Sequence, residues 1–454
     1  MAHGSTVPFE QLPNEILYLI FESSCTDNLI QEYPWPSERL SLPAIAYLPA
    51  LAISAVCTRW RSLALASPGL WSQFRLEIAP IEKTTVDTQS GFISTLQFYL
   101  TRSADSPLQI DLETQGRGHG PRNPLTLDLI LAHTTRWKRF SYTGDYDLGR
   151  CEGLSEHPSF PVLDQLALRG REMYIQVTDL DCFEHAPKLF AVSTDCLYPA
   201  ESDLRWEQLT SLDVLEARDE NITLLSQCTG LAVLKLRSGS TVSFGSSSIS
   251  LASLKSFTFV LTRKRKSSLE KILSSFAFPS LTELMLYSEY NSNANIIWPL
   301  DAFATFISRS SCILTTLSLS NVIISDLNLI AALRLLPSLA NLSTNNLLDP
   351  TGGSPLTSHF VSSMHGLSAA PLLPKLQSLS IKLLRTSFDD AAFIGMISSR
   401  WMPDPATGLD CLRSLVFHFL DRELDVELYE PLWRLDRMGM RVVITGKDNN
   451  CNGP

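Results

Sequence analysis

One apolar pattern recurs along most of the chain and limits its possible folds more than any other feature. Each copy has two apolar residues three positions apart and a third two positions further on, as in Leu163, Leu166 and Leu168. Side chains two apart in a strand point to the same side, so each copy predicts a strand with one buried face. Copies begin at positions 137, 163, 189, 209, 231, 254, 281, 314, 339, 376 and 412.

A single copy of this pattern is too small to fold alone. Burying three such side chains contributes roughly 5–9 kcal/mol, whereas ordering about 20 backbone residues costs about 1–2 kcal/mol for each residue. Neighbouring copies must therefore stack and share one core. Helical patterns at residues 300–307 and 326–336 lie between copies, so each unit is a strand, a loop and a helix. We expect an α/β fold, a solenoid with a parallel sheet.

The chain divides by composition and pattern into four segments. The expected solenoid covers residues 131–445 and is followed by a polar tail at 446–454. Residues 81–130 are expected to form a transition and the N-terminal cap of the solenoid. Residues 8–80 favour a small helical domain, interrupted by a Pro-rich insert at 26–47 that we expect to be a loop. Outside the repeats we also expect a helix through Phe92 and Leu100 and strands at 107–112 and 439–444.

The repeated pattern resembles the leucine-rich-repeat superfamily in an irregular form. Most intervals between copies fall in or near the range of about 20–29 residues that is typical of such repeats. The usual Asn three positions after the last Leu is missing, and Arg171, Gly239 and Val322 stand at such positions. Without this Asn ladder we do not expect a uniform curvature.

The N-terminal segment contains two helical stretches. Residues 12–21 begin with Pro13 and Glu15, both of which favour the first turn of a helix. The stretch is apolar on nearly all sides, so more than one of its faces must be covered. A second stretch, residues 51–64, contains a joint between two helices, with Thr58 as a possible N-cap.

The same segment resembles the F-box family, in the variant common among fungal F-box-like proteins. The match is Leu-Pro-x-Glu-Ile-Leu-x-x-Ile-Phe from Leu12, Val-Cys-x-x-Trp-x-x-Leu-Ala from Val56, and Pro-x-Leu-Trp from Pro68. The resemblance implies a three-helix domain that binds the Skp-type adaptor of a cullin-RING ubiquitin ligase. Some of the matched residues, such as Ile16, Val56 and Trp60, would equally serve as core. The implied adaptor-binding residues are Leu12, Pro13, Ile16, Leu17, Ile20, Val56, Cys57 and Trp60.

A second candidate surface is the outward side of the repeat strands. Several basic residues fall there although the chain as a whole has a net charge of −10. We hypothesise that this face accepts an acidic or phosphorylated segment of another protein. A merely solvated strand face is an equally acceptable interpretation. The candidate substrate-binding residues are Arg169, Lys235, Arg237, Tyr287 and Lys382.

Other classes of function have little support in the sequence. The 37 Lys and Arg against 47 Asp and Glu argue against nucleic acid as a partner. No apolar stretch is long enough to span a membrane. The nine Cys are odd in number and never closer than 14 residues, which disfavours both a disulfide framework and a CxxC metal site. We therefore expect no metal, no cofactor and no catalytic residue, in a protein of the cytoplasm, the nucleus or both.

These features together predict a non-enzymatic substrate-recognition subunit of a Skp-cullin-F-box type ubiquitin ligase. One alternative is a repeat scaffold for protein interaction whose N-terminal helices only cap the array and which is not engaged in ubiquitination. Another is an enzyme whose site is assembled from distant residues, but no catalytic motif supports it. The basic run at 263–266 permits a nuclear-import signal, although an exposed loop is the simpler interpretation.

Overall fold

The chain forms two compact units, each with its own stretch of parallel sheet. Unit 1 comprises Met1–Leu209 and unit 2 comprises Thr210–Pro454. The computed structural model describes residues 12–31, 47–78, 86–114, 125–171, 177–197, 204–216, 222–238, 249–261, 268–288, 296–346, 355–383 and 389–447.

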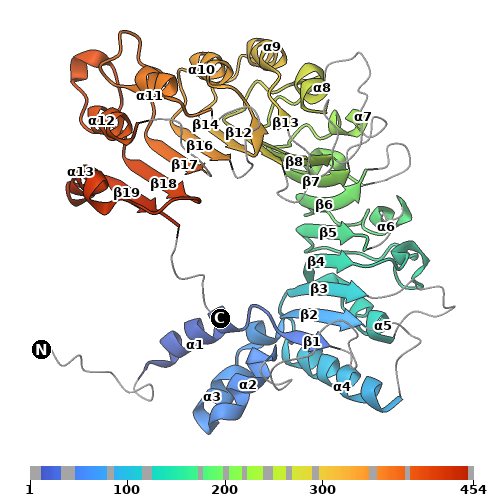
Figure 1. The fold of residues 1–454 in the computed structure, drawn as a ribbon. Coiled ribbons are helices and arrows are strands. Elements are labelled where there is room, and N and C mark those ends of the chain that lie inside the picture. Colours follow the sequence, from blue (N-terminus) through green and yellow to red (C-terminus); the bar gives the residue numbers. More distant parts are fainter. Residues whose placement is uncertain are drawn as a thin grey trace, which may run out of the picture. The chain divides into compact units, whose positions relative to one another are not determined.

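In unit 1 the strands lie side by side in the order in which they occur along the chain (Figure 1). Every described pair is parallel, which requires a crossover between consecutive strands. The strands are β1 (Leu29–Gln31), β2 (Gln73–Ile78), β3 (Leu108–Thr114), β4 (Trp137–Thr143), β5 (Gln165–Arg169) and β6 (Ala191–Cys196).

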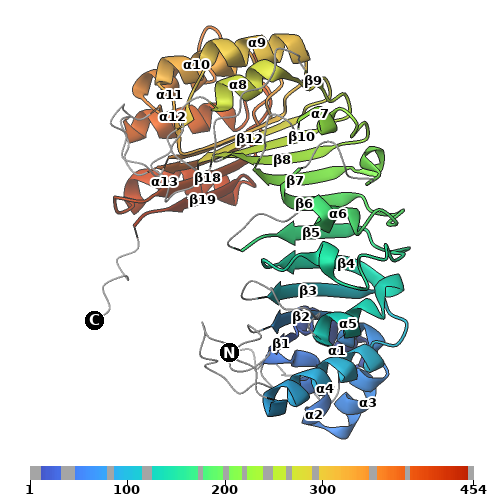
Figure 2. The same cartoon turned by 90° about the vertical axis from the view of Figure 1, so that its right-hand side faces the viewer.

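Helices of unit 1 occupy two places. The first three gather at the β1 end of the sheet, and the later ones cover one of its faces (Figures 1 and 2). Short 3₁₀ turns, η3 (Pro68–Trp71), η5 (Thr134–Arg136), η6 (Leu148–Arg150) and η7 (Trp206–Gln208), lead into or between strands. The α-helices are α1 (Asn14–Ser24), α2 (Pro49–Val56), α3 (Thr58–Leu65), α4 (Val86–Arg102), α5 (Leu125–Leu131) and α6 (Val177–Asp181).

Unit 2 repeats the strand, loop and helix unit. Its sheet contains β7 (Ser211–Glu216), β8 (Val233–Ser238), β10 (Ser256–Leu261), β12 (Glu283–Ser288), β14 (Thr316–Ser320), β16 (Asn341–Asn346), β17 (Ser378–Leu383), β18 (Ser414–Phe419) and β19 (Arg441–Thr445). Two small pairs flank it, β9 (Ile249–Ser250) with β11 (Phe276–Ala277) and β13 (Ile296–Ile297) with β15 (Val322–Ile323). Its helices are α7 (Ile222–Leu225), α8 (Ser268–Ser275), α9 (Leu300–Ser310), α10 (Asp326–Arg334), α11 (Ser358–Met364), α12 (Asp390–Arg400) and α13 (Val426–Arg437), with a 3₁₀ turn η9 (Pro405–Thr407).

The prediction of an α/β chain built from parallel strand-loop-helix units is confirmed. Each copy of the apolar pattern coincides with a strand from β4 to β18, and its last two apolar side chains are buried, as Leu166 and Leu168 are in β5. The strands expected at 107–112 and 439–444 are β3 and β19. One Asn does link neighbouring repeats although the regular Asn ladder is missing. Buried Asn321, with a φ of 55°, donates a hydrogen bond from its Nδ2 to the Ser288 carbonyl at 3.2 Å.

The N-terminal segment differs from the prediction of a purely helical domain. Residues 29–31, expected in a loop, form β1, and residues 73–78 form β2. The two strands pair in parallel, with Leu29 opposite Arg75. The link between α1 and α2 therefore adds a strand to the sheet. The helical domain is joined to the sheet through β1, which follows α1, and through β2, which follows α3. The rest of the insert, residues 32–46, lies outside the described residues, as do 8–11 and 448–454.

A single buried side chain, Asn28, connects the helices to the sheet. Its Nδ2 donates to the carbonyls of Cys25 at 2.9 Å, Leu70 at 3.3 Å and Gln73 at 2.9 Å. Its Oδ1 accepts from the Ala50 N–H at 3.1 Å, which caps the first turn of α2, and from the Tyr99 hydroxyl at 3.1 Å. The residue before α2, Leu48, offers no side-chain cap, so Asn28 supplies it from a distant part of the chain.

In unit 2, arginines at helix ends hold successive helices together. Arg309, in the last turn of α9, donates to the carbonyls of Leu273 and Phe276 at the end of α8. Arg400, the last residue of α12, is fully buried and donates to the carbonyls of Met364, Leu372 and Leu373. The carbonyls of Leu273 and Met364 lie in the last turns of α8 and α11, where helical partners are missing, and the guanidinium groups satisfy them. Burial lowers the pKa of Arg400 to about 10.

Candidate functional site

The helical corner of unit 1 is held together on its inner side. α1 packs against α2 and α3, and the Trp60 ring lies 4.9 Å from the Phe21 ring. Arg59 on α3 donates to the Asn14 Oδ1 at 2.8 Å and to the Leu12 carbonyl, which fixes the start of α1. Leu12 is half-buried beneath this contact, and Pro13 is exposed.

The outer side of the same helices is uncovered and apolar. Ile16 is 43% exposed, Leu19 58% and Ile20 37% on α1, and Val56 at the end of α2 is 61% exposed. Positions 16, 19 and 20 are three and four apart, so they share one side of α1. We call Ile16, Leu19, Ile20 and Val56 the apolar flank. Leu19 was not among the predicted residues, although its spacing from Ile16 would have identified it.

Two predictions about these helices are corrected by the structure. Leu17 is 0% exposed and belongs to the core of the helical domain, so it is not available to a partner. Its position one residue after Ile16 turns it about 100° away, toward α2 and α3. The cap of α3 is Cys57, not Thr58: the exposed Cys57 Sγ accepts from the Trp60 N–H at 3.4 Å. Trp60 itself is half-buried.

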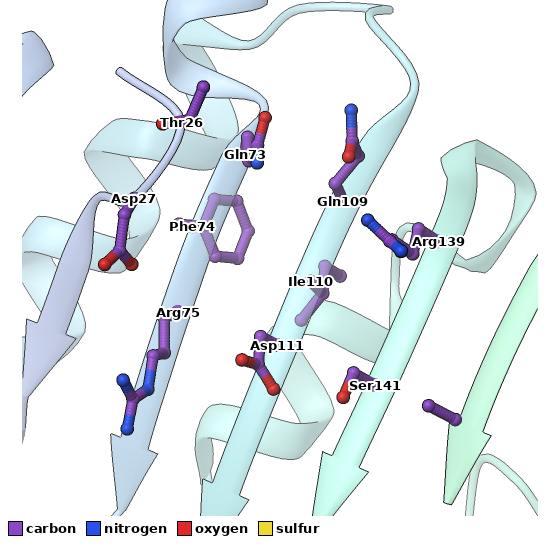
Figure 3. Close-up of a pocket in the computed structure, with 11 residues that line it drawn as sticks. Thr26, Asp27, Gln73, Phe74, Arg75, Gln109, Ile110, Asp111, Arg139 and Ser141 are labelled. Atoms are coloured by element: carbon purple, nitrogen blue, oxygen red, sulfur yellow. The ribbon is translucent and has the colours of Figure 1, made fainter. Parts of the chain in front are cut away.

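A groove crosses the uncovered face of the unit 1 sheet, the face opposite to α4 and α5. Its volume is about 280 Å³, and its polar lining comes from β2, β3 and β4 and from the loop before β1 (Figure 3). The inward-facing residues Phe74 and Ile110 contribute only to its floor, because both are buried in the core. The lining polar residues are Thr26, Asp27, Gln73, Arg75, Gln109, Asp111, Arg139 and Ser141.

A β-bulge on β4 places one of these side chains. Leu108 pairs with Trp137, but Gln109 pairs with Arg139, so Lys138 is an extra residue on β4. Lys138 and Arg139 are consequently both exposed although they are consecutive. In a regular strand only one of the two would face the groove. The bulge therefore keeps Trp137 in the core, while Arg139, next to buried Phe140, lines the groove.

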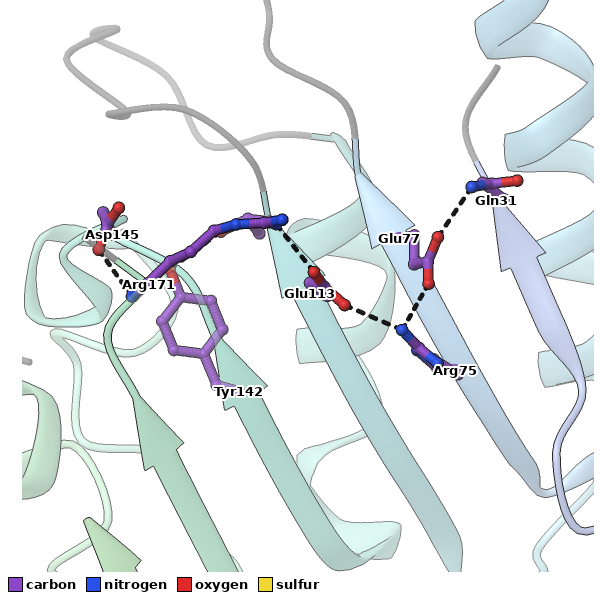
Figure 4. Close-up of polar contacts among 8 residues, drawn as sticks. Gln31, Arg75, Glu77, Glu113, Tyr142, Asp145 and Arg171 are labelled. Atoms are coloured by element: carbon purple, nitrogen blue, oxygen red, sulfur yellow. Dashed lines mark hydrogen bonds and ion pairs between the residues drawn. The ribbon is translucent and has the colours of Figure 1, made fainter. Parts of the chain in front are cut away.

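A chain of charged side chains lies along the same face, beyond the groove (Figure 4). Arg75 contacts Glu77 at 2.7 Å and Glu113 at 3.0 Å, and Glu113 also contacts Arg171 at 2.8 Å. Gln31 donates to Glu77 at 2.8 Å and so connects β1 to the chain. Arg75 thus has its charge balanced by two carboxylates outside the groove.

Asp111 lies in the middle of the groove, and its surroundings shift the pKa of its carboxyl. Burial raises the pKa of its carboxyl, and a hydrogen bond from Ser141 and the charge of Arg75 oppose that rise. Within the described part of the chain, no ion pair or hydrogen bond engages the side chains of Asp27 and Arg139, which lie on opposite sides of the groove (Figure 3).

The predicted substrate-binding residues are divided between the two units. Arg169 is in unit 1, where it lies 3.7 Å from Asp195 and donates to the Ser193 Oγ at 2.5 Å. In unit 2, Lys235 and Arg237 both approach the same carboxylate, Asp213, at 3.9 and 2.8 Å.

Arg169, Lys235 and Arg237 thus have acidic partners on neighbouring strands, which reduces the excess positive charge of this face. The hypothesis that the face accepts an acidic segment stays a prediction. Tyr287 and Lys382 are half-buried and lie in one row across the unit 2 strands.

Other site types have no structural support in the described residues. Within them, no group of three or more His, Cys, Asp or Glu is arranged to hold a metal ion. No described helix is both long and apolar enough to cross a bilayer. The basic run at 263–266 lies outside the described residues.

The sequence was compared with models of protein families and with curated proteins. No model of a known protein family matches the sequence, and no curated protein matches it significantly.

Proposed function

We propose that this chain is the substrate-recognition subunit of a Skp-cullin-F-box type ubiquitin ligase. It would bind the Skp-type adaptor through the apolar flank and a client protein through the uncovered face of its sheet. It would carry out no bond chemistry and would act by holding the client near a conjugating enzyme.

The observation that carries the proposal is the apolar flank on a small helical domain. Four large apolar side chains, Ile16, Leu19, Ile20 and Val56, remain between 37% and 61% exposed. Completing the burial of each would contribute about 1 kcal/mol, because full burial of such a side chain contributes roughly 1.5–3 kcal/mol. A group of exposed large apolar side chains on one small helical domain is typical of a binding surface.

A specific observation also favours the alternative function, a repeat scaffold outside the ubiquitin pathway. β1 joins the helical domain to the sheet, so α1 to α3 also close the end of the unit 1 core. Under that alternative the apolar flank would contact no adaptor. Adaptor binding therefore separates the two functions.

The experiment is co-purification of the full chain with a Skp-type adaptor, followed by titration of the purified components. Leu19→Glu and Ile20→Glu place charges on the flank without entering the core, so each is expected to weaken binding about tenfold or more. Leu327→Glu is the matched control, because Leu327 is 65% exposed on α10 of unit 2. Absence of binding by the unaltered chain, or equal weakening by Leu327→Glu, would refute the proposal.

A further inference from the structure

The groove in unit 1 has opposite charges at its two sides and amides between them. Asp27 lies on the β1 side and Arg139 on the β4 side (Figure 3). Gln73 pairs with Gln109, and Gln109 pairs with Arg139. Asp27 precedes Leu29 by two residues, as Gln73 precedes its partner Arg75, so Asp27 continues the same row. The row across the strands is Asp27, Gln73, Gln109 and Arg139.

The two charged side chains at the ends of this row, Asp27 and Arg139, are available to a ligand because the other charged residues of the groove interact with neighbouring side chains. Arg75 points along the strands to Glu77 and Glu113, and Asp111 accepts from Ser141 and faces Arg75. In the described residues, Arg139 and Asp27 have no such partners. Along this row a ligand would therefore meet the Asp27 carboxylate and the Arg139 guanidinium, separated by two amide side chains.

The separation between the two charges follows from the sheet. Asp27 and Arg139 are three strand spacings apart, and neighbouring strands are about 4.8 Å apart, so their Cα atoms are expected to lie about 14 Å apart. An extended peptide rises about 3.4 Å per residue and presents alternate side chains to one side. Side chains four residues apart then match the two ends of the row, and the side chain between them lies over the two glutamines.

We infer that this groove binds an extended segment of the client protein that carries a Lys or Arg four residues from an Asp or Glu. The basic side chain lies toward Asp27 and the acidic one toward Arg139. Gln73 and Gln109 hydrogen-bond to the backbone between them, since an amide both donates and accepts. The inference rests on the proposed function insofar as a substrate receptor requires a client-binding surface.

The charges near the groove exclude a polyanion as the occupant. Asp27 and Asp111 line it, and Glu77 and Glu113 lie just beyond it on the same face. Nucleic acid or a multiply phosphorylated segment would meet these carboxylates as well as Arg139. A segment with one charge of each sign matches both sides.

Fluorescence anisotropy with the full chain, without adaptor, tests the inference. The probe is a labelled nine-residue peptide with Lys at position 3, Asp at position 7 and Ser, Thr or Val elsewhere. The comparison peptide has the same composition with Lys and Asp adjacent. We expect the spaced peptide to bind about fivefold more tightly, a ratio expected from two partly exposed ion pairs. Equal affinity of the two peptides would overturn the inference.

A charge exchange identifies the groove as the site. Arg139→Glu is expected to lower affinity for the Lys–Asp peptide about tenfold and to raise affinity for a Lys–Lys peptide of the same spacing. Arg150→Glu is the control, because Arg150 is exposed and lies outside the groove lining. Loss of binding without this exchange of preference would place the peptide elsewhere and overturn the inference.

The peptide assay and the adaptor assay are independent of each other. Peptide binding uses the groove alone, and adaptor binding uses the apolar flank. If the chain binds the spaced peptide but no adaptor, the result supports the inference about the groove and refutes the proposed ligase function. If the chain binds the adaptor but binds the two peptides equally, the result supports the proposed ligase function and refutes the inference about the groove.

Discussion

Replacing Asn28 by Ala should destabilise unit 1 more than any change of an exposed Asn. The side chain is fully buried and has five hydrogen-bond partners between 2.9 and 3.3 Å. The change would leave the Ala50 N–H and the Tyr99 O–H without an acceptor from this side chain. It would also leave the carbonyls of Cys25 and Gln73 without its donors.

The expected loss follows from these four groups. Leaving a buried polar group unsatisfied costs about 1–3 kcal/mol. The weakest contact, to Leu70 at 3.3 Å, is left out of the sum. At about 1 kcal/mol for each remaining group, the free energy of unfolding of unit 1 should fall by about 4 kcal/mol. That is a large fraction of the stability of an ordinary domain.

Hydrogen exchange measured by mass spectrometry resolves this loss within unit 1. In Asn28→Ala the amides of α2 should lose protection first, because Asn28 caps that helix. Asn14→Ala is the control: Asn14 is exposed and accepts only from Arg59, so its loss should cost about 0.5 kcal/mol. A loss below about 1 kcal/mol in Asn28→Ala, or one no larger than in Asn14→Ala, would refute the reasoning.

Four further predictions concern other parts of the chain. Arg400→Leu should lower the stability of unit 2 by about 3 kcal/mol in urea unfolding, because three buried carbonyls lose their donor; a loss equal to that of the exposed Arg434→Leu would contradict this. Glu113→Gln should change stability by less than about 1 kcal/mol, since its ion pairs are partly exposed, and a larger change in thermal unfolding would contradict it. Iodoacetamide at pH 8 should label exposed Cys57 and spare the buried thiols Cys25, Cys151 and Cys182, whose pKa burial raises to about 12. Because these thiols ionise near 9.0 when unfolded, stability should fall above about pH 9, by about 1.4 kcal/mol per pH unit for each thiol; a flat pH dependence between 9 and 11 would contradict it.

The repeat strands were predictable because one pattern is repeated many times in phase. Even the degenerate copy ending in Thr344 forms a strand, β16, because its neighbours on both sides fix the register. β1 was not predictable, since three residues with only Ile30 buried carry no period. Asn28 looks like an ordinary loop residue in the sequence, and its five partners come from segments up to 71 residues away.

The apolar flank could be predicted from the sequence to a larger extent than the groove. The flank on α1 follows from helical spacing, and only the burial of Leu17 and the exposure of Leu19 needed the structure. The groove brings Asp27 and Arg139 to one face from the loop before β1 and from β4, which are distant in the sequence. A contact between segments so far apart leaves no trace in an apolar pattern.

The loop between α1 and β1 has one more consequence. Asp27, at the edge of the groove, comes three residues after Ser24, the last residue of α1. A ubiquitin-ligase adaptor on α1 and a client peptide in the groove would thus be anchored within a single short stretch of backbone. The spacing between the two bound molecules would be set there, before the first repeat begins, and lengthening the array would leave it unchanged.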